Sequence, residues 1–208
     1  MQNLALAVLE QLAACRNEMP LFHPIDLEIS AGQCIEVLGD NGTGKSTLLR
    51  TLAGFHEDYI GHFDCSEVLY QGHSLGLDPL LSPYENLRWH NGLAAGPAGS
   101  EQDSDADVIL AGLALVGLLA EAHTPVQQLS AGQQRRAGMA RWPSAPQPVW
   151  LLDEPFNALD VNAKRLVNAL IEQKCAAGGA VICATHLPVS VADKITLQLT
   201  AADSVESC

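Results

Sequence analysis

Apolar residues along the chain follow two spacings, which indicate two kinds of element. Runs of branched, apolar residues at 35–38, 149–154 and 180–185 are typical of strands that are buried on both faces, as in parallel sheets. Helical spacing follows at 47–53 and at about 161–176. Strands that alternate with helices predict an α/β fold around a parallel sheet.

The segments between these runs predict further strands. Residues 1–14 combine alternating apolar positions with strong helix formers, so their period does not separate strand from helix, and we favour an edge strand. Residues 21–38 have the pattern of a hairpin-like approach to the strand at 35–38, with a turn at 31–33. Residues 68–70 predict one more short strand.

The middle of the chain predicts helices separated by loops. We expect a short helix near 84–90, a second at 107–120, and a polar, arginine-bearing helix from Ala131. Proline has no N–H to donate inside a helix, so Pro143 requires this last helix to end near Arg141.

The strand at 35–38 leads into a glycine-rich segment that fits the pattern GxxxxGK[ST]. Its glycines let successive backbone N–H groups face phosphate oxygens, and the following helix adds its positive N-terminal end. Lys45 can reach the β- and γ-phosphates, and the Ser46 hydroxyl can bind Mg²⁺. The predicted nucleotide-binding residues are Gly39, Asp40, Asn41, Gly42, Thr43, Gly44, Lys45, Ser46 and Thr47.

Two acidic residues, Asp153 and Glu154, end a buried strand, at the edge where an open parallel sheet holds its ligand. We assign Asp153 to Mg²⁺, directly or through water, and Glu154 to orienting and deprotonating the attacking water. His186 follows the strand at 180–185 and is the predicted γ-phosphate contact. Lys45, Glu154 and His186 are the predicted catalytic residues.

Charge and length narrow the class of protein. The chain has 24 acidic residues against 11 Lys and Arg, a formal net charge of -13, which disfavours sequence-independent binding to nucleic acid. Its 208 residues suffice for one sizeable core. We therefore expect one nucleotide-binding domain over residues 1–208.

Cysteine usage and hydropathy bear on the compartment. The six cysteines form no CxxC pair and mostly lie in apolar runs, as reduced thiols do in the cytosol. The longest apolar run, at 108–120, has the length of a core helix and falls short of the roughly 18 residues of a membrane span. We expect that the chain itself does not cross a membrane.

The order of the motifs resembles the ATPase subunits of ABC transporters. The phosphate loop is followed by LSAGQQRR at 129–136, LLDEP at 151–155, ALD at 158–160 and ATH at 184–186. The resemblance implies a P-loop NTPase (RecA-like) α/β core with an antiparallel edge sheet. It also implies an inserted α-helical subdomain, at about 72–142, and a head-to-tail pair of subunits that enclose ATP.

In such a pair, the site of one subunit is completed by the other. The resemblance implies that the LSAGQ segment of one subunit reaches the nucleotide held by the phosphate loop, Asp153, Glu154 and His186 of its partner. Asp160 would lie at the subunit junction. The residues implied in this second set are Ser130, Ala131, Gly132, Gln133 and Asp160.

Further residues resemble the haem-exporter ATPase of cytochrome c maturation. They are the alanine of LSAGQQRR, YQGH at 70–73, SPYENLRW at 82–89 and the short C-terminal segment. The resemblance implies a peripheral protein at the cytoplasmic face of the inner membrane, held there only by integral membrane subunits. It implies ATP hydrolysis, with Mg²⁺, coupled to release of haem or a haem-loaded chaperone.

Two positions depart from the common ABC pattern. His73, rather than Gln71, falls where most of these ATPases place a glutamine that touches Mg²⁺, and the haem-exporter group tends to have histidine there, so both residues are candidates. No tyrosine occupies the usual adenine-stacking position. Arg16 is the nearest candidate for that contact, and a solvated surface arginine is the alternative.

Other functions share some of these motifs. The chain could serve another small ABC exporter, whereas a soluble ABC protein of DNA repair or translation would need a second cassette or a coiled coil, for which 208 residues leave no room. A cassette that only binds nucleotide would lack Lys45 or Glu154, and both are present. Catalysis is therefore the expectation.

Lys45→Ala tests the phosphate loop. The substitution removes the cation that neutralises the β- and γ-phosphate oxygens, so we expect ATP turnover to fall on the order of 10²-fold or more. Phosphate release by the purified variant measures this. Hydrolysis at the wild-type rate would contradict the assignment.

Overall fold

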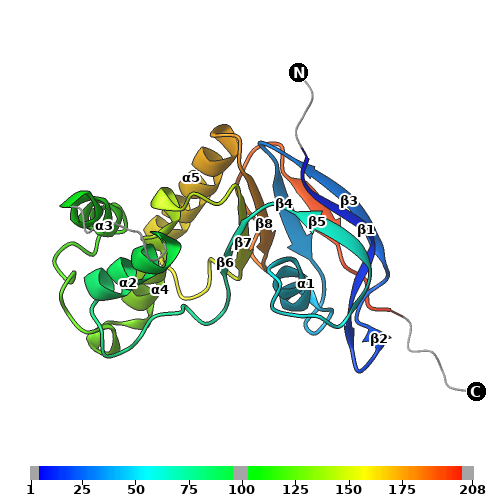
Figure 1. The fold of residues 1–208 in the computed structure, drawn as a ribbon, viewed down its shortest axis with the longest axis horizontal. Helices are drawn as coiled ribbons and strands as arrows, with labels where there is room; N and C mark the ends of the chain where they lie inside the picture. The colour runs from blue at the N-terminus through cyan, green and yellow to red at the C-terminus, as the bar shows by residue number, and fades with distance from the viewer. Residues whose placement is uncertain (1–4, 96–102, 203–208) are drawn as a thin grey trace, which may run out of the picture. The chain divides into compact units, whose positions relative to one another are not determined.

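The computed structural model describes residues 5–95 and 103–202, which form two compact units (Figure 1). The first unit combines three stretches of the chain, Met1–His73, Gln147–Phe156 and Ile171–Cys208. The second combines Ser74–Pro146 and Asn157–Leu170. The description of the chain as one nucleotide-binding domain with a subdomain at about 72–142 stays a prediction.

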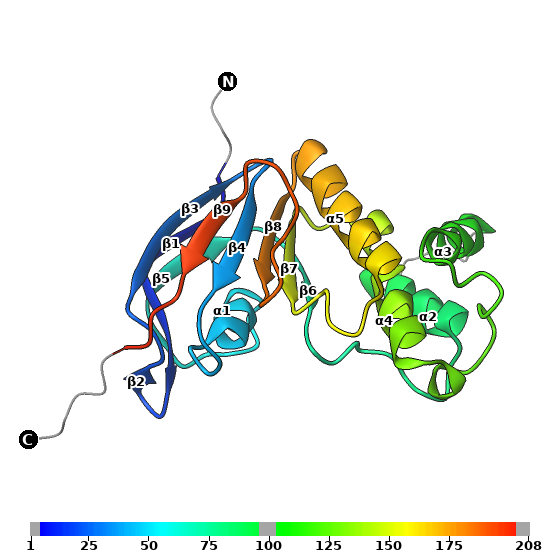
Figure 2. The ribbon, with the colours of Figure 1, turned by 180° about the vertical axis from the view of Figure 1, so that it is seen from behind.

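A five-stranded parallel sheet forms the centre of the first unit, with strand order β6-β7-β8-β4-β9. Figure 2 shows β9 beside β4. All residues of the second and third strands in this order are buried, which explains their apolar sequences. The strands are β4 (Cys34–Leu38), β6 (Val68–Gln71), β7 (Val149–Asp153), β8 (Ala180–Ala184) and β9 (Ile195–Gln198).

The parallel register places the carboxyl ends of these strands at one edge. Gln71 of β6 is opposite Leu152 of β7, and Asp153 is opposite Ala184 of β8. The strands predicted at 35–38, 149–154 and 180–185 are confirmed, except that β7 and β8 each end one residue earlier. β9 was not predicted, because its four residues are mostly exposed and too short to show a period.

A second, antiparallel sheet completes the first unit. β1 (Ala5–Arg16) pairs with β3 (Ile25–Ser30), β5 (Tyr59–Cys65) and β2 (Met19–Pro20). The strand predicted at the N-terminus is confirmed over its described residues, and residues 1–4 lie outside them. The prediction that it is an edge strand is wrong, because β1 has partners on both sides. The unpredicted partner β5 carries polar residues and a glycine, which hide its strand pattern.

The prediction of a hairpin-like approach over 21–38 is also wrong. β3 pairs with β1 in the antiparallel sheet, whereas β4 lies in the parallel sheet. The turn between them contains Gly32 at φ 87, a left-handed conformation that suits glycine. The turn therefore carries the chain from one sheet to the other.

Helix α1 (Lys45–Leu52) packs within the first unit, and the helix predicted at 47–53 is thereby confirmed. Its side chains Leu48 and Leu49 are buried in one hydrophobic cluster with Leu12 of β1 and Leu151 of β7. The phosphate loop thus joins a buried strand to a buried helix.

The second unit is helical. Its described elements include α2 (Pro83–Ala95), α3 (Asp103–Leu115), the short 3-10 helices η1 (Val126–Gln128) and η2 (Trp142–Ser144), α4 (Ala131–Met139) and most of α5 (Val161–Ala176). The last of these has the predicted bounds. Among the described residues, none of the helices is long and apolar enough to cross a bilayer.

The predicted boundaries of two helices are wrong. α2 continues past His90, because a single glycine at position 92 lowers helix stability by only about 1 kcal/mol. α3 begins at Asp103, four residues early, because acidic residues suit the first turn of a helix, and it ends before Gly117, which has φ 67. The prediction that the helix from Ala131 ends near Arg141 is confirmed, because α4 ends at Met139 and Pro143 lies in the following 3-10 helix η2.

The cysteines of the described ranges are free thiols, and Cys208 lies outside those ranges. Most of them are buried and act as small apolar residues in the core.

Leu151→Ala tests the parallel sheet as the centre of the core. Leu151 is 0% exposed, so the substitution should lower the free energy of unfolding by about 2–5 kcal/mol. Leu80→Ala is the matched control, because Leu80 is 70% exposed and its loss should change stability by about 0.5 kcal/mol or less. Urea denaturation followed by circular dichroism measures both. Equal destabilisation by the two variants would contradict this view of the core.

Candidate nucleotide-binding site

The phosphate loop connects β4 to α1 through residues 39–44. Gly42 has φ 87, and nothing lies within 4 Å of where a Cβ would stand, so the backbone is open on that side. Gly44 has φ 94, and a Cβ there would come within 3.0 Å of the Phe22 ring. The left-handed backbone conformation and the close Phe22 ring both require glycine at position 44.

Lys45 is the first residue of α1, and its side chain lies over the loop. Its Nζ donates hydrogen bonds to Gly39 O over 2.7 Å and to Asp40 O over 3.0 Å. The first N–H groups of a helix have no partners within the helix, and the helix dipole favours an anion in front of them. A buried cation beside such N–H groups fits a phosphate group.

Two predicted metal ligands are in contact. Ser46 Oγ donates to Asp153 Oδ1 over 2.9 Å, and Asp153 is buried at the end of β7. A hydroxyl and a carboxylate are the hard oxygen ligands that Mg²⁺ takes in nucleotide sites. The donor set therefore fits Mg²⁺, which would be held by Ser46 and Asp153 together with phosphate oxygens and water.

Glu154 leaves the sheet at the residue after β7. Its N–H still donates to Ala184 O over 2.8 Å, but its φ is 51, which is uncommon for a residue with a side chain. Such strained residues gather at functional sites, where the surrounding structure holds them. The carboxylate lies beside His186, with 3.4 Å between Oε1 and Nε2.

His186 follows β8 in a tight turn. The Thr185 hydroxyl accepts a hydrogen bond from Leu187 N over 3.0 Å and also contacts Leu187 O at the same distance, so the backbone on both sides of His186 is constrained. The imidazole side chain is half exposed. This arrangement leaves the ring accessible to a ligand at the sheet edge.

The two candidates for the glutamine position lie in different surroundings. Gln71 is buried at the carboxyl end of β6, whereas His73 is exposed two residues further on. The choice between them stays a prediction. Arg16 is exposed at the end of β1, opposite Met19, and its contact with adenine also stays a prediction.

The second unit carries the LSAGQ segment. Ser130 is the N-cap of α4 and forms a capping box with Gln133, whose N–H donates to Ser130 Oγ over 3.3 Å. Gln133 Oε1 in turn accepts from Ser130 N over 2.9 Å. Ser130 and Ala131 are exposed beside this local network. The Gln133 side chain is thereby used to fix the start of α4.

The turn before α5 lies against this segment. A Cβ on Gly132 would stand 3.3 Å from Ala158 O, so a larger residue there would press on the turn. Asp160 Oδ1 accepts from Ala163 N over 2.8 Å and caps α5. The residues implied at the subunit junction thus lie close together in the second unit.

A buried acid in β4 was not among the predicted residues. Glu36 is 3% exposed and accepts a hydrogen bond from the Lys194 ammonium. In the sequence, Glu36 could have been noticed as the one charged residue within an apolar strand. An acid at such a position needs a partner.

Comparison with known proteins identifies the group to which these motifs belong. The family model described as "ABC transporter" matches residues 22–157. A "Cytochrome c biogenesis ATP-binding export protein CcmA" of Saccharophagus degradans is 37% identical over 204 residues, which cover 92% of each chain. The protein with the same description from Xanthomonas campestris is 40% identical over 191 residues, which cover 84% of each chain.

A solved structure supports the fold. It is a dimeric ATP-binding cassette in a post-hydrolysis state, bound to ADP and phosphate, with a TM-score of 0.80 and 22% sequence identity. The match covers 93% of this chain and 94% of that one. The predicted α/β P-loop core with its antiparallel sheet is confirmed.

Proposed function

Because the chain belongs to the ABC transporter family, and within it to the cytochrome c biogenesis ATP-binding export proteins, we propose that it hydrolyses ATP for a haem export system. The observation that carries the proposal is the contact between Ser46 and Asp153 beside the buried amine of Lys45. These residue types are the ones that bind phosphate and Mg²⁺ in P-loop ATPases.

Each residue of the site in the first unit has its own role in ATP hydrolysis. The phosphate loop holds the β- and γ-phosphates through its N–H groups and Lys45. Ser46 and Asp153 would hold Mg²⁺, which would supply positive charge against the negative charge that develops on the phosphate oxygens. Glu154 accepts the proton of the attacking water, and His186 contacts the γ-phosphate and holds the Glu154 carboxylate in place. Gln71 and His73 are the two candidates for a further contact with the metal.

The second unit serves a partner subunit in this proposal. Ser130 is exposed at the positive N-terminal end of α4, which suits the phosphate of a nucleotide bound by another copy of the chain. Asp160 at the start of α5 would lie at the same junction. The dimeric form of the similar cassette supports a head-to-tail pair. Gly132 would complete the partner's site together with Ser130, flanked by Ala131 and by Gln133, whose side chain accepts from Ser130 N.

Integral membrane subunits are the other proposed partners. They would hold the chain as a peripheral protein at the cytoplasmic face of the inner membrane, and the coupled event would be the release of haem or of a haem-loaded chaperone. The relatives' description as export proteins supports this role.

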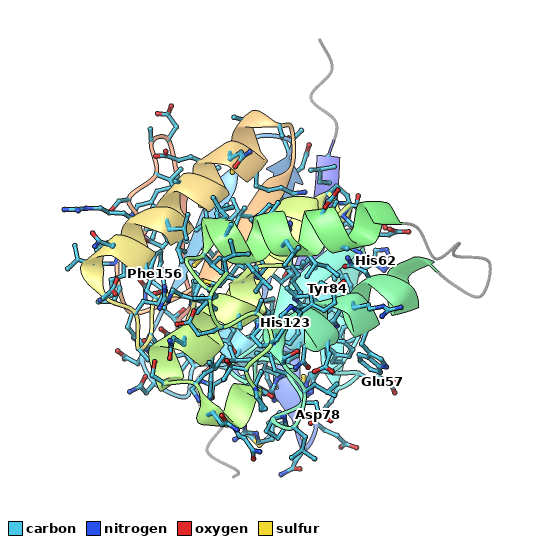
Figure 3. All side chains as sticks on the ribbon, turned by 90° about the vertical axis from the view of Figure 1, so that its left-hand side faces the viewer. Glu57, His62, Asp78, Tyr84, His123 and Phe156 are labelled. Carbon is cyan, nitrogen blue, oxygen red and sulfur yellow. The ribbon has the colours of Figure 1, made fainter. Side chains whose placement is uncertain are left out.

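The face of α2 in the second unit is the proposed contact with a membrane subunit. Arg88 is exposed and Trp89 is 60% exposed, and these residue types favour interfaces. Tyr84 is used within the unit, where its ring lies 5.2 Å from the ring of His123 (Figure 3). The contact surface therefore centres on Arg88 and Trp89.

Glu154→Gln tests the general base and the subunit pair together. The amide keeps the shape of the side chain but cannot take the proton of water, so ATP should be bound and not split. Uncleaved ATP would hold the pair closed, and the dimer population should rise with ATP concentration. Adding Ser130→Arg should reverse this.

Light scattering with ATP and Mg²⁺ measures the dimer, both for the isolated chain and for its complex with membrane subunits. Hydrolysis at the wild-type rate by the Glu154→Gln complex would exclude Glu154 as the base.

Arg88→Glu with Trp89→Ala tests the membrane contact. The substitutions reverse a charge and remove an exposed apolar surface, so copurification with membrane subunits should be lost while ATP binding is retained. Leu119→Ala is the control for loss of another exposed apolar side chain, since Leu119 is 54% exposed. Unchanged copurification of the double variant would rule this face out.

A further inference from the structure

Glu36 is an acidic residue in the interior of the parallel sheet. It lies in the middle of β4, opposite Cys183 of β8 on one side and Thr196 of β9 on the other. A buried carboxylate has lost most of its hydration, so it is stable as an anion only with strong donors around it.

The cysteines beside Glu36 are also shielded from water, since Cys34 and Cys183 are buried. Burial is the largest cause that raises the pKa of Cys34 to about 12, followed by the nearby Cys175 and Glu36 itself. Burial also raises the pKa of Cys183 well above its ordinary value. Hydrogen bonds in such surroundings are electrostatically stronger than in water.

Two donors reach one oxygen of this carboxylate. Val189 N donates to Glu36 Oε1 over 2.7 Å, and Lys194 Nζ donates to the same oxygen over 2.8 Å. Lys194 Nζ also donates to Val189 O over 2.7 Å. The two side chains thus hold both polar backbone atoms of Val189. We term Glu36, Val189 and Lys194 the Glu36 clamp.

The clamp fixes the segment that carries His186. Val189 follows His186 by three residues and is buried. On the other side of the histidine, Thr185 is also buried, and its N–H donates to Val37 O over 3.4 Å. The half-exposed His186 therefore lies between two anchors, and both are supplied by β4, through Val37 and Glu36.

We propose that Glu36 is a positioning residue for ATP hydrolysis: it fixes the backbone at Val189 and thereby holds His186 against the Glu154 carboxylate. The inference rests on the proposed function, in which His186 contacts the γ-phosphate. Glu36 does not touch the nucleotide. It acts by limiting where the imidazole can stand, and a displacement of about 1 Å at a reacting group can lower turnover on the order of 10²-fold.

The decisive variant removes the clamp and leaves the core packed. Glu36→Met together with Lys194→Met replaces the ion pair by apolar side chains, so neither charge is left without its partner in the sheet. We expect turnover to fall by about 10-fold or more, with unchanged affinity for ATP measured without Mg²⁺. Glu36→Gln is the matched control, because its amide oxygen still accepts from Val189 N, and it should keep turnover within about two-fold.

A double-mutant cycle with His186→Ala separates positioning from a general effect on the sheet. If Glu36 acts through His186, the methionine pair causes no further loss once His186 is alanine. Losses that multiply independently, or wild-type turnover by the methionine pair, overturn the proposal. Wild-type turnover by His186→Ala alone would instead contradict the role of His186 in the proposed function.

Thermal denaturation of each full-length variant, in its membrane complex, reports folding. If the methionine pair loses its thermal transition, Glu36→Gln alone takes its place with the opposite expectation. This variant removes the negative charge and keeps an oxygen that accepts from both Val189 N and Lys194, so turnover should stay within about two-fold of wild type. Loss of turnover in this folded variant would show that the charge matters and the clamp does not, and would overturn the proposal.

Discussion

One hydrogen bond, from the Ser46 hydroxyl to the Asp153 carboxylate, joins two residues that are 107 positions apart in the chain. It depends on the parallel register of β4, β8 and β7, which brings their carboxyl ends to one edge. These strands are largely buried on both faces, so hydrophobic packing fixes that register. The geometry of the site is therefore set by the core beneath it.

The second unit is organised by local hydrogen bonds. The capping box at Ser130 and the cap that Asp160 places on α5 each use residues three positions apart. Such contacts need no distant partner, and they keep the start of each helix in shape by themselves. An exposed segment that is ordered in this way can meet another subunit with little loss of conformational entropy.

The sequence predicted the parts of the fold in which local pattern and burial agree. The apolar runs of β7 and β8 and the phosphate loop follow from residue type alone. Sheet membership was not predictable in the same way, because β3 and β4 are neighbours in sequence, yet β3 pairs with the nearby β1 whereas β4 pairs with the distant β8 and β9.

In the candidate site, too, local motifs were predictable and long-range contacts were not. Ser46, Asp153 and Glu154 were identified by motifs, whose spacing is local. The contact of Glu36 with Val189 spans 153 positions, and only the fold reveals it. The position of Glu36 among apolar residues indicated that its carboxylate needs a partner. It did not indicate that the partners are Val189 and Lys194.

The hydrogen bonds of Lys45 within the phosphate loop affect how strongly the loop binds nucleotide. Its ammonium group already donates to two carbonyl oxygens of the loop, Gly39 O and Asp40 O. A phosphate that approaches must therefore compete with the backbone for this cation, and the lysine exchanges one set of oxygens for another. The affinity for nucleotide is a difference between these two sets, so a ligand with fewer phosphate oxygens within reach of the amine gains less from the exchange.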